Sequence, residues 1–500
     1  MMGVTQHPEE WLHSTLENIL TSIVGGGTPS KANSDFFQGN IPWMSVKDMN
    51  KHVLTDTIDH ITEEAVANSS TNLIPAGTPI VATRMSLGKI VVATFDSAIN
   101  QDLKALFIPS QVNTAYFVYW YRSIAKNIES LGTGTTVKGI RLDELRNLNF
   151  PLIPLAEQKE IADRLDKLLA QTEATQARLA RIPYIIKRFR QSALAAAVSG
   201  KLTEEWRDIH KPESQTFDAI NDAKNKLIKS KNIKKDLEAK VAVPTFDIPN
   251  EWLYLKLQSI ASKITDGEHK TPQRETSGRY LLSARNIQDG YISVTNVDYV
   301  GEDEFKKLRK RCDPNKGDIL ISCSGSVGRV CLVDKDDKYV MVRSAALVRI
   351  MDVFVNGKFL MYFLQSPTSQ KEIENSSKAT AQSNLFLGPI KELGVVLPSI
   401  EEQTEIVRRV EQLFAYADTI EQQAKVAKAR VDKLTQAILA KAFRGELTAD
   451  WRAANPELIS GENSAAALLA GIQAERATAK PRKRASKPAA INPTLSGVTQ

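Results

Sequence analysis

The sequence has few of the residues on which catalytic and metal sites are built. Its 500 residues include three cysteines and six histidines. Cys312, Cys323 and Cys331 fall within one segment, and their spacing matches no zinc-ligand pattern. An odd number of cysteines argues against a disulfide framework and fits a reducing compartment. We therefore expect a cytoplasmic protein.

The motifs of the common catalytic sites are also missing. There is no G-x-x-x-x-G-K-[ST] loop for ATP, no H-E-x-x-H zinc motif and no G-x-S-x-G nucleophile elbow. Nor is there an N-P-P-[YF] or D-P-P-Y run of amino-methyltransferases, or a Pro-Asp dipeptide to open a P-D…E-x-K nuclease motif. Gly25-Gly26-Gly27 could cradle a phosphate, although a plain turn is commoner beside Thr-Pro. We therefore expect a chain without catalytic residues that binds no metal or cofactor.

Long apolar runs and a strong overall charge are absent as well. No run approaches the roughly 18 residues of a membrane span, and no secretory signal is recognisable, so we expect no membrane association. The net charge is +7, but six of these charges come from the C-terminal end, at Arg476, Lys480, Arg482, Lys483, Arg484 and Lys487. Net charge is therefore weak evidence for nucleic acid, and any binding surface must come from the placement of charge.

What the sequence does contain is a long internal repeat, a signal to be sought before others. Residues 158–207 align with residues 403–452 at a constant offset of 245, without a gap, and 15 of the 50 pairs are identical. Each copy follows a long stretch of mixed sequence. A duplication this large predicts a pseudo-twofold architecture, and duplex DNA is a natural pseudo-twofold partner.

Both copies carry the 3.5-residue spacing of a coiled-coil seam. The simplest partner for each helix is the other copy, so we expect two long paired helices. Steps of four and three residues connect Ile161, Leu165, Leu168, Thr172, Thr175, Leu179, Ile182, Ile186, Phe189 and Ala193, and likewise Ile406, Val410, Leu413, Ala417, Ile420, Ala424, Ala427, Val431, Leu434 and Ile438.

The ends of these helices also have sequence signals. Residues 399–402, Ser-Ile-Glu-Glu, read as a capping box. Gly200 and Gly445 stand where a left-handed helix end is expected. Pro183 occurs in the first copy only, and a proline inside a helix removes a hydrogen bond. We therefore expect a kink or break near Ile182 in the first helix.

The two stretches that precede the helices share a fainter pattern. Short apolar runs alternate with turn signals, which predicts compact α/β or α+β domains rich in strands. Gly88-Lys89 corresponds to Gly328-Arg329 at an offset of 240, and residues 45–48 correspond to residues 283–286 at an offset of 238. The two globular domains therefore share a scaffold, while their surfaces differ.

These patterns divide the chain into six segments. They are a first globular domain (1–154), a first long helix (155–207), a lysine-rich linker with a short polar helix (208–250), a second globular domain (251–398), a second long helix (399–452) and a C-terminal extension (453–500). Within the extension we expect a last helix over 465–475 and a disordered basic tail from Ala477 onward.

Several segments resemble the specificity subunits of type I restriction–modification enzymes. Residues 154–161 and 398–406 resemble the repeated openings of their conserved helices, and residues 406–452 are very similar to the distal conserved helix of the enterobacterial IA group. Residues 317–322, followed by Gly328-Arg329, resemble a strand–turn of their target recognition domains. The resemblance covers nearly the whole chain, with specific motifs in the helices and weak ones in the globular domains.

The resemblance implies a non-catalytic subunit with two target recognition domains, each reading half of a split, asymmetric DNA sequence in the major groove. Two long antiparallel helices would hold these domains apart. They would also dock two modification subunits, which use S-adenosylmethionine to methylate adenine. Two restriction subunits, which are motor–nucleases that use ATP and Mg, would complete the enzyme.

The length of the helices suits a ruler for such a target. The seam from Ile161 to Ala193 covers about 33 residues, or roughly 50 Å at a rise of about 1.5 Å per residue. At about 3.4 Å per base pair this corresponds to about 14 base pairs. Readers at its two ends would contact DNA roughly one to one and a half turns apart.

Candidate contact residues lie in loop-like parts of both domains. Arg and Lys pair with guanine edges and Asn with adenine, and a phosphate contact or a solvated charge is the alternative for each. The candidates for base reading are Lys47, Arg84 and Lys89 in the first domain and Lys270, Arg285, Asn286 and Arg329 in the second. Trp206 and Trp451 follow the helices in matching contexts, and they either anchor modification subunits or pack against the helix base.

Two other functions are open to test from the sequence. A self-contained DNA enzyme would need an unfamiliar nuclease site, and incubation with DNA and magnesium would reveal it. A non-catalytic coiled-coil scaffold, or a DNA-binding protein outside restriction–modification, would not need two divergent globular domains. Sequence-blind DNA binding in the full complex would favour the scaffold.

Overall fold

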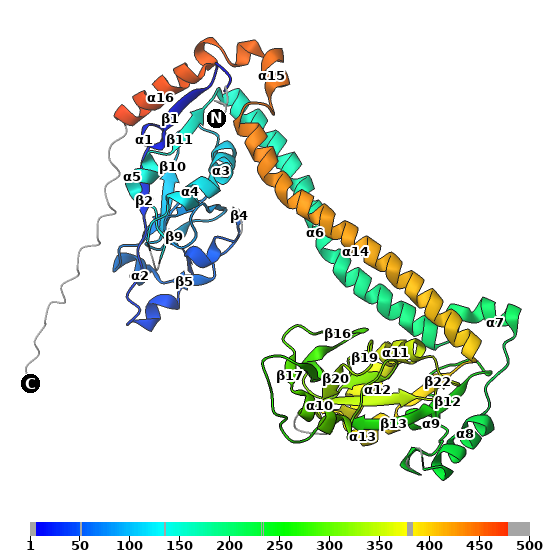
Figure 1. The fold of residues 1–500 in the computed structure, drawn as a ribbon. Helices are drawn as coiled ribbons and strands as arrows, with labels where there is room; N and C mark the ends of the chain where they lie inside the picture. Colours follow the sequence, from blue (N-terminus) through cyan, green and yellow to red (C-terminus); the bar gives the residue numbers. More distant parts are fainter. Residues whose placement is uncertain are drawn as a thin grey trace, which may run out of the picture. The chain divides into compact units, whose positions relative to one another are not determined.

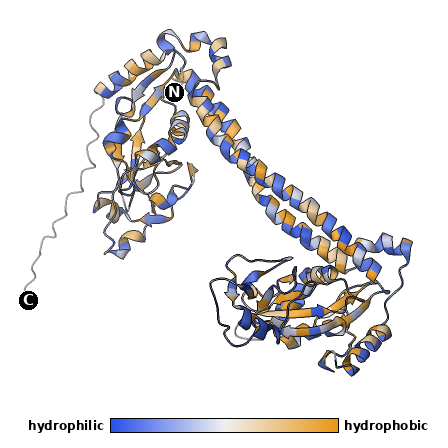
Figure 2. Ribbon diagram, viewed as in Figure 1, coloured by the Kyte–Doolittle hydropathy of each residue, from blue (hydrophilic) through white to orange (hydrophobic). Residues whose placement is uncertain are grey.

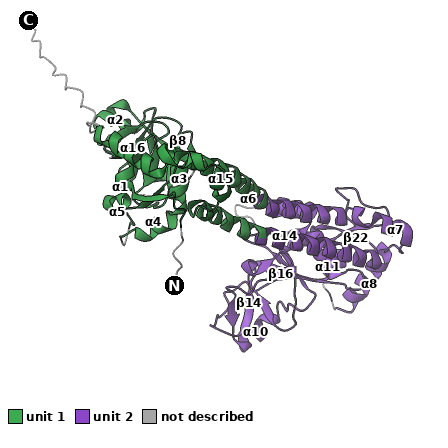
Figure 3. Cartoon of the chain, turned by 90° about the horizontal axis from the view of Figure 1, so that it is seen from above, with its two compact units in different colours: residues 1–179, 427–500 green, residues 180–426 purple. Residues whose placement is uncertain are grey.

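The computed structural model describes residues 7–50, 53–134, 137–231, 233, 235–377 and 384–478. The chain divides into two compact units, which Figure 3 distinguishes by colour. The first unit comprises residues 1–179 and 427–500, and the second comprises residues 180–426. Each unit contains one globular domain together with one part of each long helix.

The first globular domain is built on two small sheets and a two-stranded ribbon (Figure 1). One sheet has the order β2-β10-β7-β8-β4, the other has the order β5-β3-β9-β6, and β1 pairs with β11. The strands are β1 (Leu12–Thr15), β2 (Ser22–Gly25), β3 (Ile41–Met44), β4 (Val53–Leu54), β5 (Asp59–Ile61), β6 (Asn72–Ile74), β7 (Pro79–Ala82), β8 (Ile90–Ala93), β9 (Ser97–Ile99), β10 (Leu103–Phe107) and β11 (Asn149–Leu152). The helices are α1 (Leu16–Ile19), α2 (Glu63–Ala67), α3 (Thr114–Ser123), α4 (Ala125–Leu131) and α5 (Leu142–Arg146).

The second globular domain has a sheet of order β13-β21-β18-β19, a sheet of order β17-β14-β20, and the pairs β12–β22 and β15–β16. The strands are β12 (Leu253–Lys256), β13 (Ala261–Asp266), β14 (Arg279–Leu282), β15 (Ile287–Gln288), β16 (Tyr291–Ile292), β17 (Asp298–Val300), β18 (Ile319–Ser322), β19 (Val330–Leu332), β20 (Tyr339–Met341), β21 (Ala345–Ile350) and β22 (Gly394–Leu397). The helices are α9 (Leu257–Ile260), α10 (Glu302–Arg309), α11 (Gly357–Gln365), α12 (Pro367–Ser377) and α13 (Leu387–Glu392).

The two domains share one scaffold of strands although their sequences differ. The antiparallel run β2-β10-β7-β8 matches β13-β21-β18-β19, and β5-β3-β9 matches β17-β14-β20. The parallel pair β3–β9 of the first domain corresponds to the parallel pair β14–β20 of the second, and the first domain has a further parallel pair, β4 with β8. The hairpin β7–β8 and its counterpart β18–β19 are the strand–turn–strand segments indicated by the sequence. The expectation of a shared α/β (α+β) scaffold rich in strands is therefore confirmed.

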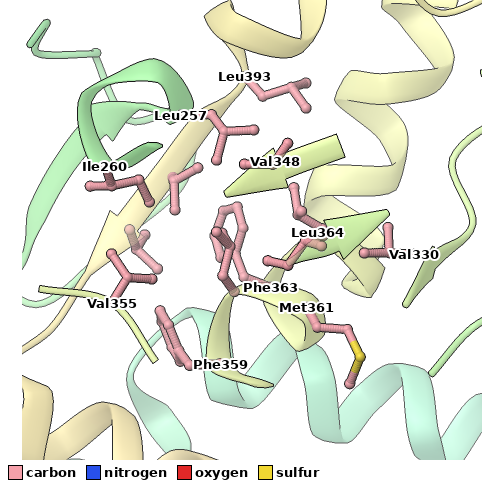
Figure 4. Close-up of a cluster of buried hydrophobic side chains, with 14 of the residues drawn as sticks. Leu257, Ile260, Val330, Val348, Val355, Phe359, Met361, Phe363, Leu364 and Leu393 are labelled. Carbon is pink, nitrogen blue, oxygen red and sulfur yellow. The ribbon is translucent and has the colours of Figure 1, made fainter. Parts of the chain in front are cut away.

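Each domain encloses an apolar core of its own. In the second domain, Leu257 and Ile260 of α9, Val348 of β21, and Phe359 and Phe363 of α11 belong to one buried cluster (Figure 4). Full burial of one such aliphatic or aromatic side chain contributes roughly 1.5–3 kcal/mol. The short helices of the domain are therefore fixed mainly by the apolar faces that they turn to the sheet.

The repeated segments form two helices of 44 residues each, α6 (Leu155–Val198) and α14 (Ile400–Phe443). They contact each other in antiparallel fashion within each unit. In the first unit, Gln176 Nε2 donates a hydrogen bond of 3.1 Å to Asp432 Oδ1. In the second unit, Arg190 Nη2 lies 2.5 Å from Asp418 Oδ1. The prediction that each copy pairs with the other is confirmed.

The helix break expected in the first copy does not occur. Residues on both sides of Pro183 belong to the same helix. Proline removes only one backbone hydrogen bond, and Ile182 and the buried Ile186 on the next turn still lie on the seam. Packing along a helix of this length outweighs one lost bond. The predicted break near Ile182 is therefore wrong. A kink of the helix at Pro183 remains a prediction.

The seam faces inward at nearly all of its expected positions. Figure 2 shows apolar and polar residues interleaved along both long helices, as a narrow buried stripe requires. Thr175 and Leu434 depart from the pattern because both are exposed, Leu434 by 46 % of its surface. The predicted seam is wrong at these two positions.

In the part of the chain that the structure describes, no helix is long and apolar enough to span a membrane.

The start of α14 is fixed by a buried glutamate and only half of the expected capping box. Ser399 Oγ accepts a hydrogen bond of 3.1 Å from the Glu402 amide, as predicted. The Glu402 carboxylate does not return to the helix start. Its Oε1 lies 2.7 Å from both Arg207 Nη1 and Thr203 Oγ1, and its Oε2 accepts from Trp252 Nε1 at 2.9 Å. The second half of the box was therefore a wrong prediction.

The start of α6 is held in the same way. The Glu157 Oε1 atom lies 2.5 Å from Arg452 Nη1 and 2.7 Å from Thr448 Oγ1, while Oε2 accepts from Trp11 Nε1 at 3.0 Å. Arg452 also donates to the carbonyl of Gly445 at 2.7 Å. In each unit, the start of one long helix is thus bound to the segment that follows the end of the other.

Gly200 and Gly445 end the two long helices as expected. Their φ angles are +78° and +80°, in the left-handed region that glycine favours. A side chain at these glycines would also collide with Pro249 and Pro8, respectively, at distances near 2.4 Å. Each glycine therefore serves both a helix end and a close approach of the chain.

The segments after the long helices also match each other. They form α7 (Glu204–His210) and α8 (Phe217–Lys229) in the second unit, and α15 (Ala449–Ala454) and α16 (Ala465–Thr478) in the first. Ile220 of α8 and Ile472 of α16 are fully buried. Helices α8 and α16 are therefore packed parts of their units. The predicted last helix is confirmed and includes Ala477, where the tail was expected to begin; residues 479–500 lie outside the described residues.

Candidate nucleic-acid interface

The candidate interface of each domain starts at a short 3-10 turn, η2 (Val46–Asp48) or η5 (Ala284–Asn286). The turn is closed by its last side chain. Asp48 Oδ2 accepts from the Ser45 amide at 2.8 Å, and Asn286 Oδ1 accepts from the Ser283 amide at 3.0 Å. These equivalent contacts confirm the match between the two segments that the sequence suggested.

Asn286 itself has a structural role. Its side chain has no exposed surface, and its Nδ2 donates to the Ser293 carbonyl at 3.0 Å while Oδ1 is bound to Ser283. A buried amide that is bound at both ends cannot reach a base edge without breaking these contacts. The geometry therefore removes Asn286 from the candidate base-reading residues. Sequence alone suggested it because Asn is a common reader of adenine.

Each turn presents one exposed cation that is paired with an equivalent acid. Lys47 Nζ lies 2.9 Å from Asp59, and Arg285 Nη2 lies 2.9 Å from Asp298. The Lys47 and Arg285 side chains are 61 % and 54 % exposed, so both cations remain accessible to a ligand. The hydrogen bond that Lys47 donates to Asp59 and, next, the charge of Asp59 raise the pKa of Lys47. Lys47 is therefore charged at neutral pH, and each of the two cations is held in place by its acid.

The second cation of each domain follows the turn between two strands. Lys89 comes between β7 and β8, and Arg329 comes between β18 and β19. Each follows a glycine with positive φ, +78° at Gly88 and +89° at Gly328. Such turns favour glycine because a side chain there is strained. The sequence pattern thus places the two cations at equivalent points of the scaffold.

An amide side chain joins the two cations in each domain. Lys89 Nζ donates to Asn50 Oδ1 at 3.1 Å, and Asn50 Nδ2 donates to the carbonyl of Lys47 at 3.1 Å. In the second domain, Arg329 Nη1 donates to Gln288 Oε1 at 3.0 Å, and Gln288 Nε2 donates to the carbonyl of Arg285 at 2.9 Å. We call these two sets the first and second cation–amide clusters.

Sequence reasoning missed both amides, although a signal was present. Asn50 and Gln288 are separated by 238 residues, which is also the offset between Lys47 and Arg285. Because one residue is Asn and the other Gln, the match does not stand out in a comparison of identical residues. An offset search that scored amides as equivalent would have found it.

Arg84 and Lys270 do not take part in the hydrogen bonds of the cation–amide clusters. Arg84 is 53 % exposed, and its Nη1 lies 3.3 Å from Asp102, a largely buried acid. Lys270 is exposed, and its backbone amide donates to Glu268 Oε1 at 3.0 Å. Among the described residues, neither side chain bonds to a member of a cation–amide cluster. The structure therefore brings together four of the six candidate cations, two in each domain.

Gly25-Gly26-Gly27 lies where backbone segments pack closely. This corrects both interpretations of the sequence, the phosphate cradle and the plain turn. Gly25 ends strand β2. A side chain at Gly26 would lie 1.9 Å from the Ile99 carbonyl, and the Gly27 amide already donates to that carbonyl at 3.0 Å. The glycines are needed because strands approach closely here. Neither a phosphate cradle nor a plain turn describes them.

Trp206 and Trp451 are both partly exposed next to the buried glutamate contacts. The ring of Trp206 stacks on His210 with centroids 4.5 Å apart, and the carbonyl of Trp451 accepts from Asn455 Nδ2 at 2.7 Å. Both precede the arginine that binds the glutamate, Arg207 or Arg452. The Trp206 indole therefore has one face packed on its own chain, and both tryptophans keep some surface open to a partner.

The cation–amide clusters supply hydrogen-bond donors for phosphate or base acceptors, and they lack the groups of a catalytic site. In the residues that the structure describes, no group of three or more His, Cys, Asp or Glu side chains could hold a metal ion. Arg presents planar paired donors that suit guanine edges, and Lys presents a compact charge. The arrangement therefore suits binding of nucleic acid.

Comparisons with known proteins agree with this chemistry. The family model described as type I restriction modification DNA specificity domain matches residues 8–184 and 248–428. The EcoBI specificity subunit of Escherichia coli is 41 % identical over 377 residues, which are 74 % of this chain and 74 % of that protein. The EcoKI specificity subunit of Escherichia coli strain K12 is 38 % identical over 366 residues, 72 % and 71 % of the two chains.

Two solved structures share the fold at low sequence identity. One is a chain from a structural study of complex assembly and conformational transition of the type I R-M system; it has a TM-score of 0.59 and 16 % identity, over 88 % of this chain and 99 % of that one. The other is the HsdS subunit of Thermoanaerobacter tengcongensis, with a TM-score of 0.53 and 17 % identity, over 89 % and 99 % of the chains.

Proposed function

This chain belongs to the type I restriction–modification DNA specificity family, and we propose on that premise that each of its globular domains reads one half of a bipartite, asymmetric DNA target. The observation that carries the proposal is the cation–amide cluster, which recurs at equivalent places in two domains of different sequence. Two unlike half-sites require two divergent surfaces, and both surfaces need hydrogen-bond donors that can contact DNA. The two domains have such donors in the same arrangement.

Within each cluster, the two cations are the proposed contacts. Arg329 and Arg285 have the planar donors that read guanine O6 and N7 in the major groove, while Lys47 and Lys89 can serve guanine or phosphate. Arg84 and Lys270 remain proposed contacts outside the clusters. Alanine at a base-reading residue should relax the preference at one base pair, whereas alanine at a phosphate contact should weaken all sequences alike.

The long helices are proposed to set the spacing between the half-sites. A helix has a nearly fixed rise of about 1.5 Å per residue, so its length translates directly into a distance along DNA. The antiparallel contacts of α6 with α14 inside each unit support this role, because a paired helix bends less than a single one.

Other subunits are proposed to supply the chemistry. A specificity subunit is not itself an enzyme, and this chain would direct adenine methylation by two modification subunits and cleavage by two restriction subunits. Those partners would bind S-adenosylmethionine, ATP and Mg, and this chain would bind none of them. The exposed parts of Trp206 and Trp451 are the proposed anchor points for the two modification subunits, since tryptophan is enriched at the energetic centres of interfaces.

Co-expression with the neighbouring modification subunit, followed by genome-wide mapping of methylated adenines, tests this function. Methylation at one split, asymmetric motif would support it and would name the target. A complex that forms but modifies no motif would contradict it and favour a scaffold. The proposed anchor points are tested separately. Trp206→Ala and Trp451→Ala should each weaken binding of the modification subunits, by similar factors because the surroundings of the two tryptophans are equivalent.

A further inference from the structure

The amide in each cluster occupies a position that the proposed function does not explain. Asn50 and Gln288 each bond with one end to a cation and with the other end to a backbone carbonyl. Because the carbonyl accepts only from the amide N–H, the orientation of the amide group is fixed. Its oxygen must then point to the cation.

This arrangement places the cation before any ligand arrives. A free Lys or Arg side chain has many rotamers, and the entropy lost when it is ordered opposes binding. Lys89 and Arg329 are each tied to a residue 39 or 41 positions earlier in the chain. Their reach is thus fixed relative to the turn that carries Lys47 or Arg285.

We propose that Asn50 and Gln288 are positioning residues for sequence specificity, which hold Lys89 and Arg329 in the orientation that selects one base pair in each half-site. The inference rests on the proposed function. Asn50 acts on the half-site of the first domain and Gln288 on that of the second. The same geometry recurs in two domains of different sequence, and this recurrence supports a functional role for the amide.

The contacts of these amides favour positioning over a role in folding. Asn50 is exposed, and Gln288 is only partly buried. The buried member of each turn is a different residue, Asp48 or Asn286, and it already closes the turn through the Ser45 or Ser283 amide. Removal of Asn50 therefore leaves the fold of the turn intact and frees Lys89.

The test uses the complex of the full chain with its modification subunit. Methylation rates are measured on the target found by genome mapping and on all its single-base variants, for Asn50→Ala, Lys89→Ala and the double variant. Asn50→Ala and Lys89→Ala should relax the same base pair of one half-site by about 5- to 150-fold, the range of one good base contact. The double variant should be no worse than Lys89→Ala, since both changes remove one interaction.

Conservative variants and a second domain sharpen the result. Asn50→Gln should keep the preference, because Gln288 performs the same role with a longer side chain. Asn50→Asp should lose it, since a carboxylate cannot donate to the Lys47 carbonyl. Gln288→Ala should relax one base pair of the other half-site and leave the first unchanged. Asn127→Ala, at an exposed residue of α4, should change nothing.

Each other outcome overturns the inference. If Asn50→Ala and Lys89→Ala relax different base pairs, or if their effects multiply, Asn50 does not act through Lys89. If Asn50→Ala slows methylation of all sequences equally, its role is structural or directed at phosphate. A wild-type complex that modifies no motif refutes the proposed function, and the inference falls with it. This result is distinguishable from the outcomes for the Asn50 and Lys89 variants, which require an active wild-type complex.

Discussion

Arg452 Nη1 lies 2.5 Å from Oε1 of Glu157, although the two residues are 295 positions apart in the chain. The Glu157 side chain has no exposed surface, and that of Arg452 is 12 % exposed. The pair Glu402–Arg207 repeats this contact at 2.7 Å in the other unit. The internal repeat thus places a helix start of one copy against the segment after the other copy in both units.

Loss of one partner from this ion pair should destabilise the first unit strongly. Arg452→Met leaves the Glu157 carboxylate buried and uncompensated, which costs about 3–5 kcal/mol. Glu157→Gln/Arg452→Met should be less destabilised than the sum of the single changes. Hydrogen exchange of the α15 amides as a function of urea measures the effect.

Two control variants accompany this measurement. Arg207→Met should have a comparable effect on the α7 amides of the second unit, while Arg444→Met, at the exposed pair with Glu446, should change little. A small effect of Arg452→Met, similar to that of Arg444→Met, would show that the buried pair is not needed for this helix start.

Stability of the second unit should depend on pH through Lys224. Its ammonium is buried and donates to the carbonyls of Gln258 and Ala261 at 2.8 and 2.5 Å, and burial lowers its pKa to about 8. Between pH 8 and about 10.5, the folded state has released this proton while the unfolded state still holds it. Stability should therefore rise with pH across this window, by up to about 3 kcal/mol.

The measurement is urea unfolding of the wild type and of Lys224→Met at several pH values from 7 to 11. The difference between the two free energies isolates this one group. It should change with pH between 8 and 10.5 and be constant below 8. Arg476 holds the equivalent position on α16 and donates to the Glu17 carbonyl; Arg476→Met should give a pH-independent difference. Parallel curves for wild type and Lys224→Met would refute the prediction.

All three thiols should be unreactive in the folded protein. Cys312, Cys323 and Cys331 are buried, and burial raises the pKa of each to about 12. Only an accessible thiolate attacks a disulfide reagent rapidly. Titration with Ellman's reagent at pH 8 should give no fast reaction in the native state and three equivalents in guanidinium chloride. One fast-reacting thiol in native protein would mean that the sheet of the second domain opens easily.

Lengthening both long helices by one heptad should lengthen the spacer between the half-sites. A heptad preserves the seam and adds about 10.5 Å at about 1.5 Å per residue, which corresponds to at most about three base pairs. The insertions must face each other in α6 and α14, because the helices are paired within each unit. Mapping of methylated adenines should find both half-sites unchanged and the spacer longer.

A matched control has the same heptad inserted into α14 alone. This variant should lose methylation, since one helix then has no partner for the added turns. An unchanged spacer in the doubly lengthened variant would remove the helices as the ruler.

The family was recognisable from the helices, and the family model and close relatives confirm it. Helix signals are local, so one sequence carries them: the seam repeats every three or four residues, and Gly200 and Gly445 mark the ends. Pro183 misled because a local rule was applied where packing along the whole helix decides. The shared scaffold of the domains followed from short matches around the turns that end at Gly88 and Gly328.

The candidate site was only partly predictable. The equivalence of Lys47 with Arg285 and of Lys89 with Arg329 could be read from constant offsets. The sequence did not reveal that Asn286 is buried, because burial depends on which strands cover the turn. Asn50 and Gln288 share the offset of 238 in the sequence, but their bonds to residues 39 and 41 positions away could not be read from it.

By itself, the sequence determined the duplication, the two long helices with their seam and ends, and the strand-rich character of the two domains, since each depends on short-range periodicity or on a repeated offset. Tertiary structure alone decided the contacts between distant segments. These are the buried pairs Glu157–Arg452 and Glu402–Arg207, the cation–amide clusters, and the burial of Lys224. The physical reason is that such contacts join residues which only the packed sheets and helices bring within hydrogen-bonding distance.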